Sequence, residues 1–585
     1  MTTPSRDELQ ARAQAWMADD PDETTRDELR ALIDAGRWDE IGDRFAGRLE
    51  FGTAGLRGVI GAGPNRMNRA VVRAASAGLC AYLEATTGGA KERGIAVAFD
   101  GRRLSAELAR ETAEVATARG FKVRIFETVQ PTPVLAYACK RTGAAAGVMV
   151  TASHNPPEYN GYKVYWGNGA QIVPPHDVGI AAAIESCGPL LGMTLRPFED
   201  ARRAGLIEIL GAELEDEYHA EIQKLLVATS TPRDVRIAYT ALHGVGDRHV
   251  RRALATAGFA EVHSVASQAE PDGAFPTVRF PNPEEPGAMD HVLELAREVD
   301  AELVLANDPD ADRLAVAVRT APGAYVQLTG NEVGCLLAHY LLEHGTKDPK
   351  RAVLSSIVSS PMLGAIAQVH GAHWEQTLTG FKWIANRAME LESEGYRFVC
   401  GYEEALGYTV GPLVRDKDGV SGALLMAELA AWSKAHGRTL IDELELMSRR
   451  YGLFLSRQVS VTMKGADGAA MIGRIMERVR AQPPTSVGVH AVLAVIDLSQ
   501  GERRVRTGAV EKLALPPSNV IAMELDGGHR VMLRPSGTEP KIKYYFDLRE
   551  VTGEKEPVQS ARARGERLLE AMSESFLAYV EPLSK

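Results

Sequence analysis

The sequence predicts an α/β protein with three related three-layer domains of mixed sheet, followed by a smaller α+β domain with a largely antiparallel sheet. First, apolar strand-like runs alternate with helical patterns from Ile95 onward, which is typical of α/β domains. Second, the order of strand, small-residue loop and helix recurs until about Tyr451, where short strands with hairpin-type breaks replace it. Third, a chain of 585 residues is too long for one core.

Composition narrows the class of protein. The chain has 66 basic and 77 acidic residues, a net charge of −11, which disfavours a general nucleic-acid or anionic-membrane binder but allows a local phosphate pocket. No apolar run reaches the roughly 18 residues of a membrane helix. The five cysteines are scattered and form no CxxC, so reduced thiols are expected. We expect a cytoplasmic monomer or small homo-oligomer that binds neither nucleic acid nor membrane.

The first domain is predicted over residues 1–208. It begins with short amphipathic helices over residues 7–50. Ile95–Phe99 is expected to be a buried strand, and Ser105 to be the N-cap of a helix that ends near Gly120. Val123–Phe126 is the next predicted strand.

The stretch VMVTASHNPPEYNGYKVY ends this domain's strand pattern. The apolar run before Ser153 predicts that this serine lies on an exposed loop, which the following prolines stiffen. Lys163 falls in the strand-like run after the Asn160-Gly161 turn. A serine becomes a nucleophile only with a base, a lowered pKa or a metal, and His154 and Lys163 are the nearby candidates. A proline-rich surface loop without chemistry is the alternative for an isolated Ser–His pair.

The second domain, predicted over residues 209–325, carries the sequence DPDADR directly after the apolar strand ELVLAND. Asp308, Asp310 and Asp312 alternate along the chain and can converge on a hard cation such as Mg²⁺. Three anions packed together without a cation would repel one another. A solvated acidic turn is the alternative, whereas an EF-hand is disfavoured because Arg313 stands where that loop requires glycine.

The third and fourth domains are predicted over residues 326–455 and 456–585. The third carries GFKW in a turn-rich loop and GYEEALGY after a buried strand. The fourth carries RPSGTEP, in which Arg534, two hydroxyls and a glycine-exposed backbone could cradle an anion, with Lys543 close by. A tight turn between strands is the alternative for this motif alone.

The motifs TASHNP with NGYK, FGTAGLRG, DPDADR and RPSGTEP occur in an order that resembles the α-D-phosphohexomutases, the family of phosphoglucomutase and phosphomannomutase. The resemblance covers nearly the whole chain and is greatest to the branch of phosphoglucomutase-2-like phosphopentomutases and bacterial α-phosphoglucomutases. It implies four domains around a central cleft and a phosphoserine at Ser153. Arg57 would hold the phosphoryl group, and a phosphoserine oxygen would join the three aspartates around Mg²⁺. Arg313 would neutralise charge.

The same resemblance assigns the substrate-binding residues. Those for the sugar are Lys382, Glu403, Arg415 and position 405, where Ala405 replaces the family's serine. Those for the non-reacting phosphate are Arg534, Ser536, Gly537, Thr538 and Lys543. Pro309 also departs from the family, which has glycine there.

The implied activity is that of an intramolecular phosphotransferase, which interconverts α-D-glucose 1-phosphate and glucose 6-phosphate. Ser153 would exchange its phosphoryl group through a sugar bisphosphate, with glucose 1,6-bisphosphate as activator, and Lys163 or His154 would be the general acid/base. Mannose and pentose phosphates are alternative substrates. A serine hydrolase using Ser153 and His154 is disfavoured because no G-x-S-x-G elbow is present. A sugar-phosphate-binding protein without catalysis is disfavoured by the presence of Ser153, Arg57 and the three aspartates together.

Overall fold

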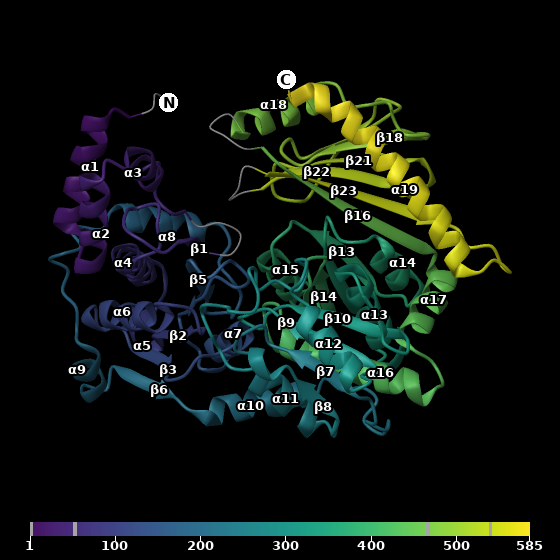
Figure 1. Cartoon of the computed structure of the whole chain (residues 1–585), viewed down its shortest axis with the longest axis horizontal. Coiled ribbons are helices and arrows are strands. Elements are labelled where there is room, and N and C mark those ends of the chain that lie inside the picture. The colour runs from purple at the N-terminus through teal and green to yellow at the C-terminus, as the bar shows by residue number, and fades with distance from the viewer. Residues whose placement is uncertain (1–3, 51–54, 464–467, 537–540, 585) are drawn as a thin grey trace. The chain divides into compact units, whose positions relative to one another are not determined.

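The structure is a computed structural model that describes residues 4–50, 55–463, 468–536 and 541–584. The chain divides into two compact units. Unit 1 comprises residues 1–329 and 405–435, and unit 2 comprises residues 330–404 and 436–585. Figure 1 shows the elements, which are described below one unit at a time. Among the described helices, none combines the length and apolarity that crossing a membrane requires.

Unit 1 begins with a small helical layer, as the sequence predicts. A capping box between Ser5 and Glu8 starts the first helix, and Leu9, Leu29 and Ile41 form the centre of a separate apolar cluster. The helices are α1 (Arg6–Asp19), α2 (Glu23–Asp34) and α3 (Trp38–Arg44).

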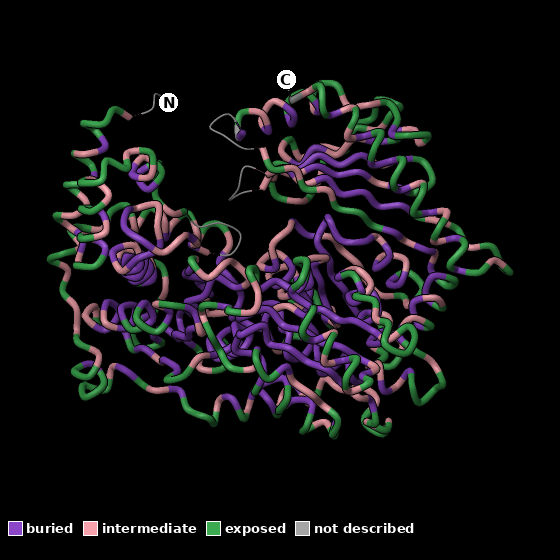
Figure 2. Tube along the Cα trace, viewed as in Figure 1, coloured by how far each residue is buried: buried purple, intermediate pink, exposed green. Residues whose placement is uncertain are grey.

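The first sheet of unit 1 is mixed and has the strand order β1-β5-β4-β2-β3-β6. Its four strands β4, β2, β3 and β6 run parallel, whereas β5 pairs antiparallel with both β4 and β1. Every residue of β2 and β4 is buried, in agreement with their unbroken apolar sequences (Figure 2). The strands are β1 (Leu56–Val59), β2 (Ile95–Phe99), β3 (Val123–Phe126), β4 (Ala146–Val150), β5 (Tyr159–Trp166) and β6 (Ile207–Leu210). The helices are α4 (Arg69–Thr86), α5 (Ala90–Arg93), α6 (Ser105–Ala118), α7 (Thr132–Arg141), α8 (His176–Glu185), α9 (Phe198–Arg203) and α10 (Ala212–Gln223).

The start of α6 differs from the prediction. Leu104, in the left-handed conformation with φ of 64°, is the N-cap, and Ser105 is the first helical residue. The Ser105 hydroxyl donates a hydrogen bond to Asp100 Oδ1 at 2.6 Å instead of capping the helix. The predicted N-cap was therefore wrong, because the carboxylate of Asp100, five residues earlier and directly after β2, takes the hydroxyl.

The second sheet of unit 1 has the order β11-β10-β9-β7-β8. Strands β7, β8 and β9 are parallel, and β10 returns antiparallel to β9. The strands are β7 (Ile237–Thr240), β8 (Val262–Ser264), β9 (Leu303–Asn307), β10 (Leu314–Ala321) and β11 (Ala324–Gln327). The helical elements are α11 (Asp247–Thr256), η1 (Ala266–Gln268), α12 (Asp290–Glu298) and α16 (Gly419–Ala435), the last preceded by strand β15 (Gly407–Val410).

Unit 2 begins with a parallel arrangement in which β12 lies between β13 and β14. The predicted turn-rich loop at GFKW is shorter than expected, because α15 already begins at Phe381 and places Lys382 in the first helical turn. The strands are β12 (Arg351–Ser356), β13 (His373–Thr377) and β14 (Arg397–Glu403). The helices are α13 (Gly330–His344), α14 (Met362–Val369), α15 (Phe381–Ser393) and α17 (Leu440–Tyr451).

The C-terminal part of unit 2 is an antiparallel sheet in the order β16-β23-β22-β21-β18-β19-β20. Helix α19 lies along this sheet (Figure 1) and contacts β16 and β23. The predicted fold class, three mixed α/β domains and a largely antiparallel C-terminal domain, is confirmed. The strands are β16 (Leu453–Thr462), β17 (Ser486–Val487), β18 (His490–Asp497), β19 (Glu502–Val505), β20 (Val510–Lys512), β21 (Ile521–Leu525), β22 (Arg530–Pro535) and β23 (Lys541–Glu550). The helices are α18 (Gly468–Ala481), η2 (Asp526–Gly528), α19 (Val558–Val580) and η3 (Glu581–Ser584).

Candidate active site

Ser153 lies in the loop after β4 and has the left-handed φ of 51°. A non-glycine residue in this conformation costs energy and persists only where its surroundings enforce it, often at functional sites. Its N–H donates to Thr151 Oγ1 at 2.8 Å. The residue is only 2% exposed, so the predicted exposure of the serine was wrong, although residues 154–159 that follow it are half-buried or exposed. Ser153 itself contacts Arg102 and Asp308, two residues far from it in the sequence.

Arg102 organises the serine loop from the segment after β2. Its guanidinium donates to the backbone carbonyl oxygens of Ser153, Asn155, Pro156 and Tyr159. Asp100 lies beside it, with 3.5 Å between Arg102 Nε and Asp100 Oδ2. One buried cation therefore fixes the course of the whole loop. Sequence reasoning missed Arg102, because nothing in its own neighbourhood indicates which carbonyls it contacts.

The three aspartates after β9 meet the serine loop. Ser153 Oγ donates to Asp308 Oδ2 at 2.7 Å. Asp310 Oδ2 accepts from Thr132 Oγ1 and from Lys163 Nζ, both at 2.7 Å. Lys163 Nζ also lies 3.1 Å from Asp312 Oδ2. The structure thus brings together segments that are 155 residues apart in the chain.

The aspartate cluster fits a divalent cation. One carboxylate oxygen from each aspartate lies within 4.8 Å of the others. The Oδ1 atoms of Asp310 and Asp312 are buried and have no hydrogen-bond partner among the described residues, which is costly for an anionic oxygen unless a cation satisfies it. Burial and the neighbouring carboxylates raise the pKa of Asp308 well above its usual range. Oxygen-only donors of this kind suit a hard cation, so these residues could hold one.

Lys163 and Lys417 supply positive charge around Asp312. Burial opposes the charge of Lys163, but the Asp310 and Asp312 carboxylates outweigh burial and raise its pKa. Lys417 Nζ lies 3.1 Å from Asp312 Oδ2 and 3.4 Å from Asp416 Oδ1. Asp416 in turn accepts hydrogen bonds from Tyr165 and Gln171, each at 2.6 Å.

Sequence reasoning singled out Arg415 in the RDKDG segment and missed Asp416 and Lys417. In the structure Arg415 is buried before α16. The next two residues make the contacts: Asp416 accepts hydrogen bonds from Tyr165 and Gln171, and Lys417 pairs with Asp312. The signal that could have found them is the alternation of acid and base directly before a helix.

His154, Arg57 and Arg313 surround the serine and the aspartates. His154 Nδ1 lies 3.2 Å from Ser153 Oγ, and burial together with nearby Arg313 and Arg57 lowers the histidine pKa well below its usual value. Arg57, on β1, donates to Asn155 Oδ1 at 2.8 Å, and burial lowers its pKa to about 10.

Arg313 binds the turn that precedes it and the segment before β15. Its backbone N–H donates to Asp308 Oδ1 at 3.0 Å. Its Nη1 donates to the carbonyl oxygen of Ala405 at 3.2 Å. Position 405 therefore contributes a backbone acceptor here, irrespective of its side chain.

The remaining predicted residues belong to unit 2. The N–H of Gly380, just before α15, donates to Glu403 Oε1 at 2.7 Å, so the GFKW and GYEE segments meet. Arg534 on β22 pairs in register with Lys543 on β23. The Ser536 N–H donates to the Lys541 carbonyl at 2.7 Å. Gly537 and Thr538, like Phe51–Ala54 of FGTAGLRG, lie outside the described residues.

Comparisons with known proteins show the family to which the chain belongs. Family models described as phosphoglucomutase/phosphomannomutase alpha/beta/alpha domains I, II and III match residues 48–188, 216–323 and 329–450 in that order. A probable phosphoribomutase of Schizosaccharomyces pombe is 39% identical over 558 residues, which are 92% of this chain and 94% of that protein. The chain belongs to the α-D-phosphohexomutase superfamily.

Relatives within this superfamily carry different substrate names. A probable phosphomannomutase of Haemophilus influenzae is 42% identical, covering 83% of this chain and 93% of that protein. A phosphoglucomutase of Staphylococcus epidermidis is 38% identical, covering 86% and 90%. The crystal structure of a putative phosphomannomutase from Thermus thermophilus has a TM-score of 0.67 at 22% identity, covering 92% of this chain and 99% of that one, and shows the same fold. The chain is therefore a phosphosugar mutase family enzyme, an isomerase.

Proposed function

We propose that this enzyme interconverts α-D-glucose 1-phosphate and glucose 6-phosphate through a phosphoserine at Ser153. The observation that carries the proposal is the 2.7 Å contact between Ser153 Oγ and Asp308 Oδ2, within a cluster of three buried aspartates. This contact supports the proposal because it brings the Ser153 hydroxyl next to carboxylates that could hold a cation.

Asp308, Asp310 and Asp312 would hold Mg²⁺, with the Ser153 oxygen beside them. When bound, the cation would neutralise charge on the transferring phosphoryl group. Arg57 lies next to the loop through Asn155, and its guanidinium can donate two hydrogen bonds to phosphate oxygens. Arg313 would balance the remaining carboxylate charge.

The reaction requires two phosphoryl transfers in opposite directions. In the first, the P–O bond to Ser153 breaks, a sugar hydroxyl oxygen bonds to phosphorus and that hydroxyl loses its proton. The product is a sugar bisphosphate, whose other phosphate then returns to Ser153. His154 and Lys163 are the candidates for holding the proton. His154 Nδ1 faces the serine oxygen directly at 3.2 Å. Lys163 contacts Asp310 and Asp312, which raise its pKa and keep it protonated, so His154 would be the better acceptor of the proton.

A second phosphate site must hold the group that does not react. Arg534 and Lys543, which pair across β22 and β23, together with the Ser536 segment would supply it. Glu403 would bind two adjacent sugar hydroxyls with its two carboxylate oxygens. The contact from the Gly380 N–H to Glu403 would orient that carboxylate beside Lys382.

Pentose phosphate is the second candidate substrate. The Schizosaccharomyces pombe relative is named a probable phosphoribomutase and matches 92% of this chain, whereas the Staphylococcus epidermidis phosphoglucomutase matches 86%. Ala405, which lacks the hydroxyl expected beside the sugar, is compatible with a smaller substrate. Mannose phosphate is a further alternative with the same mechanism.

The test is a turnover assay with Mg²⁺ and a catalytic amount of glucose 1,6-bisphosphate. Glucose 1-phosphate, mannose 1-phosphate and ribose 1-phosphate are compared at equal concentration. We expect the highest kcat/KM for glucose 1-phosphate, and transfer of ³²P from labelled bisphosphate to Ser153. A preference for ribose or mannose phosphate would overturn the assignment of glucose phosphate as the substrate, but it would not affect the phosphoserine mechanism.

Two serine variants decide the mechanism. Ser153→Ala should reduce turnover and labelling to background. The matched control is Ser433→Ala. Ser433 is a buried serine in α16 whose Oγ has no hydrogen-bond partner in the part of the chain that the structure describes, so this variant should keep wild-type turnover. Activity or labelling that survives in Ser153→Ala would overturn the phosphoserine mechanism.

A further inference from the structure

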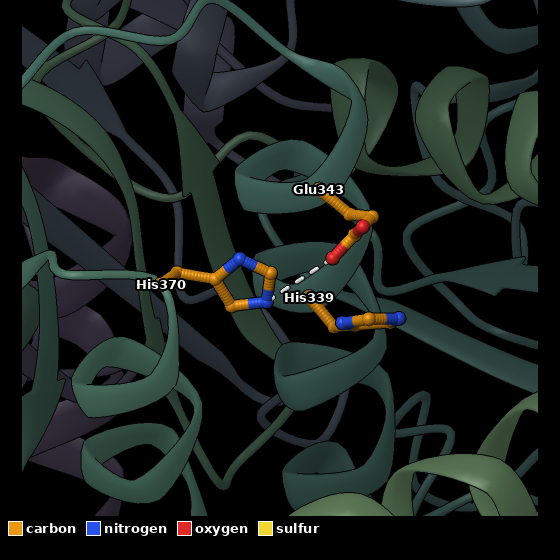
Figure 3. A group of neighbouring side chains, drawn as sticks. All are labelled: His339, Glu343 and His370. Carbon is orange, nitrogen blue, oxygen red and sulfur yellow. Dashed lines mark ion pairs between the residues drawn. The ribbon is translucent and has the colours of Figure 1, made fainter.

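A second cluster of metal-ligating side chains lies in unit 2, where α13, α14 and α17 meet. We call it the histidine cluster; it consists of His339, Glu343, His370 and Tyr451. Figure 3 shows the two imidazole rings and the Glu343 carboxylate turned toward one another. In the part of the chain that the structure describes, it is the only group of potential ligands besides the aspartate cluster in which three such residues converge.

The helices place these side chains close together. His339 and Glu343 are four residues apart on α13 and therefore share one face of the helix. His370 directly follows α14, as its C-cap. One ligand atom from each of the three residues lies within 4.8 Å of the others, and His370 Nε2 is 3.5 Å from Glu343 Oε2. Small side-chain movements would bring all three to the roughly 2 Å at which zinc is bound.

Tyr451 marks the point on which the two rings converge. Its hydroxyl oxygen lies 2.9 Å from His339 Nδ1 and 2.9 Å from His370 Nε2. A phenol has one proton, so it can donate to one ring nitrogen and must accept from the N–H of the other. The two nitrogens thus face a common centre.

The charge and burial of the cluster suit a dication. Both rings must be neutral to bind a metal, because only an unprotonated ring nitrogen has a lone pair to offer. Glu343 supplies the negative charge and shares it with Arg450, whose Nη1 is 3.0 Å away. The His370 side chain is 6% exposed and that of Glu343 is 37% exposed, which leaves a path from solvent on the glutamate side.

We propose that His339, Glu343 and His370 form a binding site for a divalent transition metal of the zinc type, separate from the aspartate cluster. Two imidazoles and one carboxylate are the donors that zinc, cobalt and nickel prefer, whereas Mg²⁺ prefers oxygen donors alone. The chemistry of the donors thus separates the two sites: the aspartate cluster takes the hard cation and the histidine cluster the softer one.

The position of the site gives it a structural role. Tyr451 is the last residue of α17, and β16 of the C-terminal sheet begins at Leu453. A metal at this point would tie the ends of α13, α14 and α17 together directly before the chain enters the antiparallel sheet. The bound metal would also draw Glu343 away from Arg450. The free energy of metal binding must therefore exceed the loss of the Glu343–Arg450 ion pair.

The test uses Co²⁺ as the probe, because tetrahedral cobalt absorbs visible light strongly. Chelator-treated full-length protein is titrated with Co²⁺ in excess Mg²⁺, which occupies the aspartate cluster. We expect tetrahedral d–d bands in the wild type and their loss in His339→Gln/His370→Gln. We also expect the melting temperature of the wild type, but not of the variant, to rise with Co²⁺ or Zn²⁺.

Two further variants keep the proposal open to refutation. His373→Gln removes a histidine of unit 2 that pairs with Glu375 at 2.6 Å outside the cluster, and it should bind Co²⁺ as the wild type does. Glu343→Gln keeps both imidazole rings and replaces the double variant if that variant does not fold. It should weaken Co²⁺ binding at least about 10-fold. Equal Co²⁺ binding in wild type and cluster variants, or octahedral spectra in the wild type, would overturn the proposal.

Discussion

Gly244 offers a test of how tightly the aspartate loop is held in place. It lies in the ALHGVG turn after β7, and the next N–H, from Val245, donates to the Pro309 carbonyl at 2.9 Å. A Cβ added at Gly244 would lie 2.3 Å from Pro309 Cα and 2.5 Å from Pro309 O, where ordinary contact needs 3.4–4 Å. Gly244→Ala must therefore displace Pro309 by about 1 Å, because the obstacle is backbone and cannot rotate away.

The displacement acts directly on the aspartates, since Pro309 stands between Asp308 and Asp310. The contact of Asp308 Oδ2 with Ser153 Oγ is 2.7 Å, and a shift of this size would break it. Overpacking of this kind costs about 1–3 kcal/mol of stability. A misplacement of about 1 Å in a catalytic group can cost about 100-fold in rate. We expect Gly244→Ala to remain folded, to melt at lower temperature and to lose about 100-fold in kcat/KM.

The assay is mutase turnover with Mg²⁺ and glucose 1,6-bisphosphate, together with thermal unfolding. Gly188→Ala is the matched control, because Gly188 is exposed and its added Cβ would meet nothing within 4 Å. Equal kcat/KM and equal melting temperatures for the two variants would refute the inference that the ALHGVG turn fixes the aspartate loop.

Two further predictions concern buried charge in unit 1. Lys417→Met should destabilise the protein by up to about 3–5 kcal/mol, because it removes the lysine that pairs with the buried carboxylate of Asp416, whereas Asp312 keeps Lys163. Denaturant unfolding should show part of this loss recovered in Lys417→Met/Asp416→Asn, and additive losses would contradict the pairing. His219 Nε2 lies 3.2 Å from His249 Nδ1, and burial with Arg252 and Arg248 lowers its pKa to about 4 from 6.5. Below pH 6.5 the unfolded chain therefore binds the proton first, and stability should fall by roughly 2 kcal/mol between pH 7.5 and 5. His219→Gln should lose less stability over that range, as unfolding at both pH values can show. Equal pH dependence in the two proteins would exclude this role.

The sequence predicted well where local pattern decides the structure. The unbroken apolar runs of β2, β4 and β9 are buried strands, and α11 begins at Asp247 as expected. Ser153 and Asp308–Asp312 follow β4 and β9, and these polar residues at strand ends do lie together. Their assigned chemical roles and the four domain boundaries stay predictions.

The sequence failed where the residue types allow a side chain more than one partner. Ser105 looks like an N-cap, yet its hydroxyl bonds to Asp100. Arg102 looks like a surface arginine, yet it is buried against four carbonyl groups of the serine loop. In both cases the local residue type permits several partners, and only the packed loops select one.

The site itself is assembled from the ends of strands in two different sheets. Ser153 follows β4 of the first sheet, and Asp308 follows β9 of the second. Loops at the carboxyl ends of strands are where α/β proteins bind their ligands. Here two such loops hold each other, each with a non-glycine residue at positive φ, Ser153 at 51° and Ala311 at 53°. Neither sheet alone supplies both the hydroxyl and the carboxylates. The contact between the two loops maintains the strained conformations of Ser153 and Ala311.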